Sequence, residues 1–420
     1  MDLLNINYEK YSLKNGLKVI LHQKKDIPLV AVNIWYKVGS SNEVKGKTGI
    51  AHLFEHMMFQ GSLNVPKEKH FKYIQEAGGT LNASTSFDRT NYYEKLPSNY
   101  LELALWLESD RMGFFLPALD QVKLDNQKGV VSNERLQRYD NQPYGLAWET
   151  IITKFFPDNH PYSWPTIGFM DDIKSYTLDD VQNFFTQYYS PSNATLTIVG
   201  DIDLKETKYL VEKYFAEISA NNKIVPIQSS AFSLEKKITL SQKEDVQLER
   251  IYLALPSVEI FNENEVSIDI LLDILAGSKS SRLHKKLVHN LQIAQDVSAF
   301  QFSGKYGGVI LFSVTAKPGL TTQNIKQEIL NEIDNVNNNG ITENELLRAK
   351  NVIKSQFVYS LQNIDILADQ INHYDYYLNE PNSLAMDLKR YADTSIESVV
   401  NASKNFLTKN YLELVISPKK

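Results

Sequence analysis

The chain has 420 residues, of which 43% are hydrophobic and 22% are charged, and its formal net charge is −6 at pH 7. This composition is typical of a folded globular protein, and the length predicts two or more domains. The acidic balance argues against a nucleic-acid partner, and the complete lack of cysteine excludes disulfides, thiolate metal ligands and a cysteine nucleophile.

The sequence also argues against a membrane protein. No apolar run approaches the roughly 18 residues that a membrane-spanning helix needs. The N-terminal segment, MDLLNINYEKYSLKNG, does not show a basic stretch followed by an apolar one, as a secretory signal would. We therefore expect a cytoplasmic protein, with the periplasm as the alternative if a signal has been removed.

Two similar successions of strand and helix occur along the chain. Residues 28–38, PLVAVNIWYKV, alternate apolar and polar side chains as a half-buried strand does, and a helical stretch follows as far as Gly61. Residues 249–258, ERIYLALPSV, are again strand-like, and the helical pattern of 264–278 runs into Gly277. The offset between the two glycines is close to half the length of the chain.

A second pair of predicted helices has nearly the same spacing. LDNQKGVVSNERL at 124–136 aligns with LLRAKNVIKSQFV at 346–358, at almost the offset that separates the two glycines. Two offsets this similar indicate a duplicated domain of roughly 200 residues that mixes strands with long helices, an α+β pattern. We predict a first domain at 1–218, a polar linker at 219–232 and a homologous second domain at 233–420.

The helix that ends near Gly61 carries an unusual cluster of ionisable residues. Its sequence GIAHLFEHMMFQGS places His52, Glu55 and His56 close together. Residues i and i+4 share one helix face, about 5–6 Å apart at Cβ, so both histidines can reach one ion. Neutral imidazoles suit zinc, and Glu55 leans to the same side, where it can act as a general base. The spacing is HExxH read backwards, the inverted zincin motif.

The duplication supports a metal at this cluster. The offset aligns the three ionisable residues with Ile268, Leu271 and Leu272 in the second copy. Burial of unpaired polar or charged groups costs several kcal/mol, so they need a partner, and a metal ion is the one we expect. The alternative is an ordinary amphipathic helix, because HxxEH is a short pattern that also occurs by chance. With no cysteine in the chain, a third ligand must be a carboxylate or another histidine.

The segment GIAHLFEHMMFQGS closely resembles the signature of the pitrilysin family of zinc peptidases, in which insulin-degrading enzyme and mitochondrial processing peptidase are grouped. The resemblance covers essentially the whole chain, in weaker form in the second half. It extends to EAGGTLNASTSFDRTNYYEKLP (76–97), NERLQRYDNQPYG (133–145), HPYSWPTIG (160–168) and YYSPSNATLTIVGDID (188–203).

This resemblance implies a fold and a set of site residues. The fold would be two homologous domains, each a mainly antiparallel sheet flanked by helices, as in the processing-peptidase-like metallohydrolases. By position, Glu134 would be the third zinc ligand beside His52 and His56, and Glu55 would be the catalytic base. The alternative for Glu134 is an exposed helical glutamate without a special role.

The resemblance also implies where a substrate binds. Asn82, Ala83 and Ser84 match an edge strand to which, in the family, the substrate adds as an extra strand. Backbone hydrogen bonds would then give affinity that is largely independent of the substrate's side chains. The alternative is a plain hairpin edge.

Two departures from the family pattern matter. Many relatives have a second glutamate seven residues before the ligand glutamate, whereas this chain has Gln127. Active single-chain relatives carry an arginine and a tyrosine seven residues apart, which grip the substrate and stabilise the oxyanion. The corresponding positions here are Val288 and Gln295, and neither side chain can substitute. Donors directed at a developing oxyanion typically contribute about 10²–10³ in rate.

These features predict the zinc-bearing subunit of a heterodimeric peptidase that cleaves unfolded peptides inside a closed chamber. A homologous partner subunit would supply the missing arginine and tyrosine. Two alternatives remain from the sequence: a self-sufficient homodimeric zinc peptidase with another oxyanion donor, and a non-catalytic scaffold or peptide-binding subunit.

Overall fold

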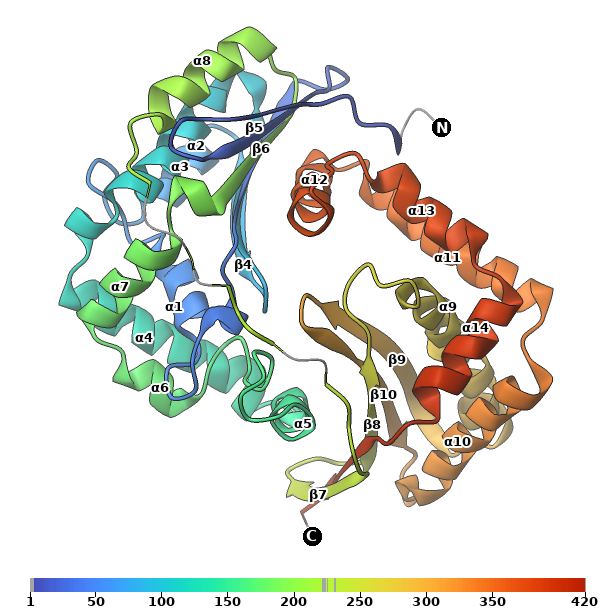
Figure 1. Ribbon diagram of the computed structural model, residues 1–420. Coiled ribbons are helices and arrows are strands. Elements are labelled where there is room, and N and C mark those ends of the chain that lie inside the picture. Colours follow the sequence, from blue (N-terminus) through green and yellow to red (C-terminus); the bar gives the residue numbers. More distant parts are fainter. Residues whose placement is uncertain (1–3, 221–223, 225, 230–231, 420) are drawn as a thin grey trace. The chain divides into compact units, whose positions relative to one another are not determined.

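The computed structural model describes residues 4–220, 224, 226–229 and 232–419, so part of the predicted linker 219–232 lies outside the described residues. The chain forms two compact units, each with one β-sheet flanked by helices (Figure 1). Unit 1 runs up to Leu136 and includes Trp164–Gln228 and Val358–Ala385. Unit 2 consists of Gln137–Ser163, Ser229–Phe357 and the chain from Met386 onward.

Unit 1 is built on a six-stranded sheet in the order β1-β2-β6-β3-β5-β4. Every neighbouring pair is antiparallel except β2 and β6, which are parallel. The central strand β6 is buried along its whole length, whereas β4 lies at one edge and is partly exposed. The strands are β1 (Glu9–Ser12), β2 (Lys18–Gln23), β3 (Leu29–Tyr36), β4 (Thr80–Thr85), β5 (Thr90–Pro97) and β6 (Ala194–Gly200).

Helices cover both faces of this sheet. Figure 1 shows α12 alone on one face and the other helices of the unit on the opposite face. Asn372 on α12 accepts a hydrogen bond from Thr197 Oγ1 (2.7 Å) and donates one to Asn33 O (3.1 Å), which ties the helix to the two central strands. The helices are α1 (Ile50–Met57), α2 (Lys69–Glu76), α3 (Leu101–Phe114), α4 (Gln121–Arg135), α6 (Met170–Ser175), α7 (Leu178–Tyr188), α8 (Leu204–Phe215) and α12 (Ile364–Leu378).

Unit 2 contains a five-stranded sheet in the order β7-β11-β8-β10-β9. Its strands are β7 (Ile238–Glu244), β8 (Arg250–Ser257), β9 (Ala294–Gly304), β10 (Gly307–Ala316) and β11 (Leu412–Pro418). The helices that lie in it wholly or for most of their length are α5 (Ala147–Phe155), α9 (Glu265–Ala276), α10 (Thr322–Asn339), α11 (Glu343–Ser360), α13 (Leu384–Asp393) and α14 (Ile396–Ala402).

The two sheets repeat one topology, which confirms the predicted α+β fold of two homologous halves. Strands β2, β6, β3, β5 and β4 correspond in order to β7, β11, β8, β10 and β9, and the single parallel pair is the equivalent one in each sheet. The compact units combine segments from both halves of the sequence, because α12 belongs to unit 1 and α5 to unit 2. They are therefore not the same division as the predicted homologous halves 1–218 and 233–420.

Helix α9 occupies the place in unit 2 that α1 has in unit 1, after the equivalent strand. Its residues Ile268, Leu271 and Leu272 are buried in the hydrophobic core of the unit. These are the positions that align with the ionisable residues of α1. In the second copy, these positions therefore serve packing.

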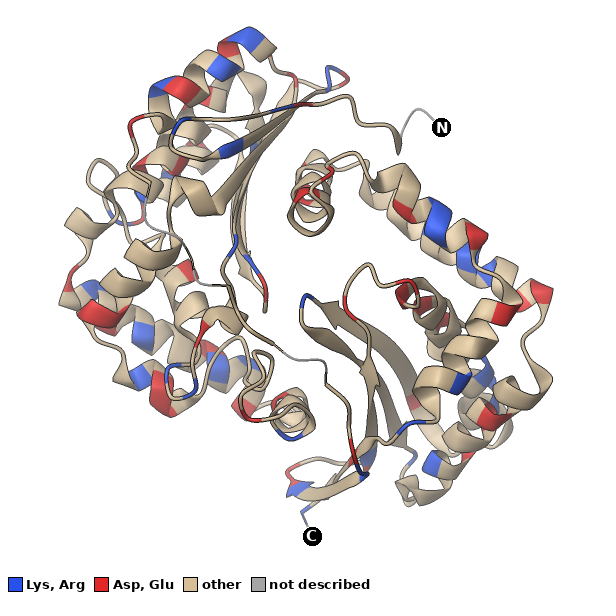
Figure 2. Ribbon diagram, in the orientation of Figure 1, with Lys and Arg blue, Asp and Glu red and all other residues tan. Residues whose placement is uncertain are grey.

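Charged side chains are distributed without a dominant sign. Figure 2 shows basic and acidic residues interspersed along the helices of both units. Within the described residues, every helix is too short or too polar to cross a membrane.

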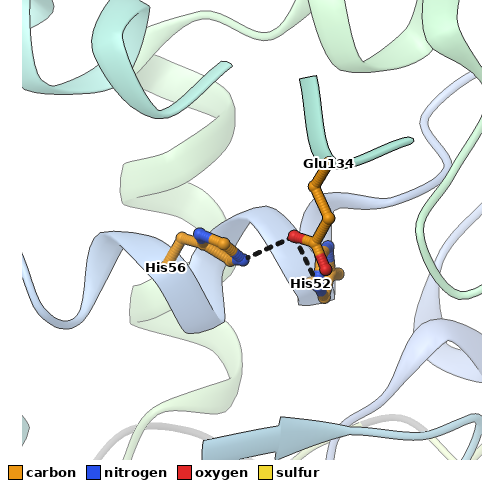
Figure 3. Close-up of side chains that lie close together, drawn as sticks. All are labelled: His52, His56 and Glu134. Carbon is orange, nitrogen blue, oxygen red and sulfur yellow. Dashed lines mark ion pairs between the residues drawn. The ribbon is translucent and has the colours of Figure 1, made fainter. Parts of the chain in front are cut away.

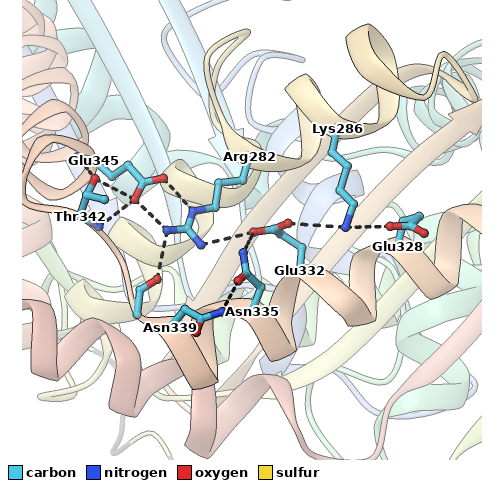
Figure 4. A network of polar contacts seen from close by, with 9 residues as sticks. Arg282, Lys286, Glu328, Glu332, Asn335, Asn339, Thr342 and Glu345 are labelled. Carbon is cyan, nitrogen blue, oxygen red and sulfur yellow. Dashed lines mark hydrogen bonds and ion pairs between the residues drawn. The ribbon is translucent and has the colours of Figure 1, made fainter.

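A polar network joins the segment after α9 to α10 and α11 (Figure 4). Arg282 donates to both carboxylate oxygens of Glu345, from Nε (2.7 Å) and Nη2 (2.8 Å). The same guanidinium donates to Gly340 O (3.1 Å) and Glu332 Oε1 (3.3 Å). Lys286 lies 3.7 Å from Glu332 Oε2 and extends the network. Bidentate pairs of this kind fix geometry as well as adding energy.

The Arg282–Glu345 pair predicts an acid-dependent loss of stability. Hydrogen bonds from Arg282 lower the pKa of Glu345 from its ordinary 4.5 to about 2. A lowered folded-state pKa stabilises the protein above pH 4.5, and this contribution is lost as the pH falls toward 2. Arg282→Gln should lower the free energy of unfolding at pH 7 by about 1–3 kcal/mol.

Urea titrations of both proteins at several pH values measure this difference, which should shrink between pH 4.5 and pH 2. The matched control is Lys389→Gln, which removes an exposed pair with Asp393 and should change stability little. A difference between wild type and Arg282→Gln that stays constant over this range would contradict the assignment.

Candidate metal centre

The helix that carries the ionisable cluster is fixed by its apolar side. Leu53, Phe54 and Met57 are fully buried, and together they orient α1 in the unit. Spacings of one, three and four residues put these apolar side chains on one stripe of a helix. His52 and His56 are therefore directed away from the core and keep 14% and 24% of their side-chain surface exposed.

Helix α4 brings a carboxylate to the two histidines. Glu134 lies in the last turn of α4, and its Oε2 is 3.2 Å from His56 Nε2 and 3.7 Å from His52 Nε2 (Figure 3). One donor atom from each of the three residues lies within 4.8 Å of the other two. The structure thus brings together the three residues that the sequence predicts as ligands, from two helices that lie far apart along the chain.

The donor set and its spacing fit a zinc ion. Tetrahedral zinc binds nitrogen and oxygen at about 2.0–2.2 Å, which requires donor atoms roughly 3.3–3.5 Å apart. The distance from Glu134 Oε2 to His56 Nε2 (3.2 Å) lies just below this range, and the distance to His52 Nε2 (3.7 Å) lies just above it. Two imidazoles and one carboxylate leave a fourth position for water or substrate, as in catalytic zinc sites.

Glu55 lies beside this cluster and outside the donor set. Thr85 Oγ1, at the end of β4, donates a hydrogen bond of 2.5 Å to Glu55 Oε2. Burial raises the pKa of the Glu55 carboxyl above its ordinary value, while the Thr85 hydrogen bond and the nearby His56 act in the opposite direction.

Strand β4 presents an open edge next to Glu55. In an antiparallel ladder the backbone groups of alternate residues face the neighbouring strand. The hydrogen bonds from Ser86 N to Arg89 O and from Ser98 N to Pro28 O, at the two ends of β5, show which residues of β4 face β5. Asn82 and Ser84 direct their N–H and C=O groups to β5, whereas Leu81, Ala83 and Thr85 direct theirs to the open side. Of the three predicted substrate residues, Ala83 is the one with backbone groups at the edge.

Side chains of the neighbouring residues already contact this edge. Ala83 N donates to the side-chain oxygen of Asn82 (2.9 Å), so this amide occupies the donor that an added strand would use. Ser84 Oγ donates to Asn91 Oδ1 (2.7 Å) on β5. Asn82 can therefore affect strand addition through its side chain, and Ser84 stabilises the hairpin.

The structure also places the three residues that depart from the family pattern. Gln127 is buried on α4, two turns before Glu134. In unit 2, Val288 packs against the hydrophobic core and Gln295 is exposed on β9. Among the described residues, a second group that could hold a metal ion consists of the buried side chains of His70, Glu94 and Glu108, and both groups lie in unit 1.

Some residues of this site carry no signal that sequence reasoning could use. Thr85 is not singled out by any pattern, although it directly follows the predicted edge residues. Glu43, whose carboxylate accepts hydrogen bonds from the start of α1, belongs to no recognisable motif. The segment 160–168 is part of the family resemblance, but the sequence assigns no role to it.

A duplicated α+β topology with a His–His–Glu cluster in its first copy defines the processing-peptidase-like metallohydrolase class. Residues 18–163 match the family described as Insulinase (Peptidase family M16), and residues 175–353 match the Peptidase M16 inactive domain. The chain therefore belongs to the insulinase family, peptidase family M16. Within residues 175–353, which the second match covers, the described residues form no candidate metal cluster.

Individual relatives agree with this assignment over nearly their whole length. The zinc protease PqqE of Helicobacter pylori is 30% identical over 408 residues, which are 95% of this chain and 90% of the relative. The uncharacterized zinc protease YmxG of Bacillus subtilis is 25% identical and covers 98% of both chains. A crystal structure of a protease from Helicobacter pylori superposes with a TM-score of 0.91 at 28% identity, covering 99% of this chain and 100% of that one.

Proposed function

We propose that this chain is the zinc-bearing subunit of an endopeptidase that cleaves unfolded peptides. The observation that carries the proposal is the convergence of His52, His56 and Glu134 beside Glu55, at the open edge of β4. Membership of a peptidase family, with relatives named zinc proteases, supports it.

Each residue of the site has a role in this proposal. His52, His56 and Glu134 hold the zinc ion, which when bound supplies the Lewis acidity for activating water and polarising the scissile carbonyl. Glu55 accepts the proton of the attacking water and later transfers it to the leaving amine. The Thr85 hydroxyl holds one carboxylate oxygen of Glu55, so the other oxygen is the one available for proton transfer.

A metal-removal experiment tests the proposal. The purified chain, combined with a homologous subunit where one is needed, should hydrolyse a quenched fluorescent peptide. Dialysis against a chelator should abolish the activity, and one equivalent of zinc should restore it. Hydrolysis that persists without zinc would refute the proposed function.

The substrate is proposed to bind as an additional strand on β4. Main-chain pairing suits a peptidase that acts on unfolded chains of varied sequence, because every residue offers the same backbone groups. The side chain of Asn82, which now accepts from Ala83 N, would turn away as the substrate carbonyl takes its place.

Ala83→Pro tests this substrate edge. Proline removes the one N–H group of Ala83, which points away from β5, so the β4–β5 ladder keeps its hydrogen bonds. Loss of one backbone hydrogen bond corresponds to about 1 kcal/mol, so KM should rise at least about fivefold with unchanged zinc content. Steady-state kinetics on an unstructured peptide measure this effect. Ala83→Val, which keeps the donor, is the control, and wild-type KM in the proline variant would place the substrate elsewhere.

The proposed assembly is a heterodimer with a homologous subunit. Val288 and Gln295 stand where active single-chain relatives are expected to carry arginine and tyrosine, and Val288 contributes to the core instead. A partner that carries both residues would complete the site, and four homologous domains would enclose a chamber that admits unfolded peptides. A homodimer with another oxyanion donor is the alternative assembly.

A further inference from the structure

The two elements that supply the predicted ligands meet a common loop, which belongs to the segment HPYSWPTIG. On the α1 side, Gly49 precedes the helix with a φ of 86°, and it has no side chain to cap the helix. A Cβ atom on Gly49 would lie 2.5 Å from Ile167 O and 2.7 Å from Gly168 Cα. The backbones of Gly49 and Gly168 are therefore in direct contact, and only glycine permits this approach.

Glu43 fixes the α1 end of this contact. Its carboxylate is buried and accepts hydrogen bonds from Gly49 N (2.9 Å) and Ala51 N (2.8 Å). A carboxylate at a helix N-terminus satisfies backbone donors that the helix itself leaves open, and it interacts favourably with the helix dipole. The start of α1, just before His52, is thus held by a carboxylate from the segment that precedes the helix.

Arg135 fixes the α4 end. It directly follows the predicted ligand Glu134, is buried, and donates from Nη1 to Gly168 O (2.6 Å). One glycine thus touches the backbone that begins α1 and accepts the hydrogen bond from the residue after Glu134. A short path of contacts thus connects the start of α1 with the end of α4.

We propose that Glu43, Gly49, Gly168 and Arg135 form a positioning brace that sets the separation of the metal ligands and so the affinity of the site for zinc. The inference rests on the proposed zinc site but concerns residues that do not touch the ion. Removal of groups that orient metal ligands typically weakens metal affinity by about 10- to 100-fold. We expect the zinc affinity to fall by this factor when the contacts of Arg135 or Gly168 are disrupted.

The test compares two methionine substitutions on α4. Arg135→Met removes the hydrogen bond to Gly168 O. The matched control, Lys128→Met, removes a bond from the same helix to Tyr176 O (2.9 Å), further along the same region of the chain. Zinc dissociation constants are measured by chelator competition on apo proteins whose circular dichroism and thermal unfolding have been recorded.

Arg135→Met should bind zinc about 10- to 100-fold more weakly than wild type, whereas Lys128→Met should stay within about threefold. Cobalt-substituted Arg135→Met should also show an altered visible absorption spectrum, which reports ligand geometry and which a mere loss of stability would leave unchanged. Gly168→Ala, whose Cβ would meet Thr48 O at 2.4 Å, should weaken zinc binding with Arg135 intact and replaces Arg135→Met if that variant fails to fold.

The outcomes separate the brace from the zinc site. Wild-type affinity and an unchanged cobalt spectrum in Arg135→Met and Gly168→Ala would overturn the brace and leave the proposed function standing. Equal weakening in Arg135→Met and Lys128→Met would overturn it as well, because general anchoring of α4 would then explain both. A wild-type chain that binds no zinc would refute the proposed function itself.

Discussion

Glu55→Gln should lower the turnover number by a factor of about 10² or more while one zinc ion per chain remains bound, since general-base catalysis contributes on this scale. Glutamine has the shape of glutamate but cannot accept the proton from water. The three predicted ligands are untouched, and the Thr85 hydroxyl can still donate to the amide oxygen. Steady-state kinetics with the partner subunit present, beside elemental analysis of the same sample, measure both quantities.

The control for this variant is Glu76→Gln, which changes an exposed glutamate on α2 of unit 1 that is not part of the predicted donor set. It should keep wild-type turnover. Wild-type turnover in Glu55→Gln would assign the proton transfer to another group. Loss of zinc from Glu55→Gln would instead show that Glu55 supports the metal directly.

The second large effect concerns the partner. The isolated, zinc-loaded chain should be nearly inactive on peptides, and addition of a homologous subunit with the arginine–tyrosine pair should raise the rate by about 10²–10³, the usual contribution of an oxyanion donor. The expectation rests on Val288 and Gln295, which offer neither a cation nor a phenol.

A peptidase assay on the chain alone and on the mixture checks this expectation. The double variant Val288→Arg and Gln295→Tyr is not expected to restore activity, because residue 288 packs against the core of unit 2 and an arginine there would disturb it. Equal activity of the chain with and without the partner would contradict the heterodimer and favour the self-sufficient homodimer.

Much of the fold followed from periodicity in the sequence. The alternation at 28–38 predicted the strand β3, and the helical pattern before Gly61 predicted α1, because single elements depend on local spacing. The expectation that this strand is half-buried was wrong, because helices cover both faces of the sheet and bury every residue of β3 except the partly exposed Leu29. The repeat offsets predicted two homologous halves, which the equivalent strand orders confirm. The mixing of segments in the compact units was not predictable, because the placement of α5 and α12 depends on long-range packing that leaves no local signature.

Some residues of the candidate site could likewise be predicted from the sequence, whereas others could not. The spacing of His52 and His56 on one helix is visible in the sequence, and the family resemblance indicated Glu134. Residues that act through three-dimensional contacts, such as Thr85 on Glu55 and Arg135 on Gly168, lie far along the chain from their partners. Neither pair has a fixed spacing that a pattern could encode, so both required the structure.

We propose that one zinc ion binds between α1 and α4 at His52, His56 and Glu134. Anomalous diffraction from a crystal of the zinc-loaded chain, recorded on both sides of the zinc absorption edge, tests it most directly. We predict one strong anomalous peak per chain, about 2.0–2.2 Å from both histidine nitrogens and a Glu134 oxygen. No peak at these three side chains, or a strong peak at another position only, would contradict it.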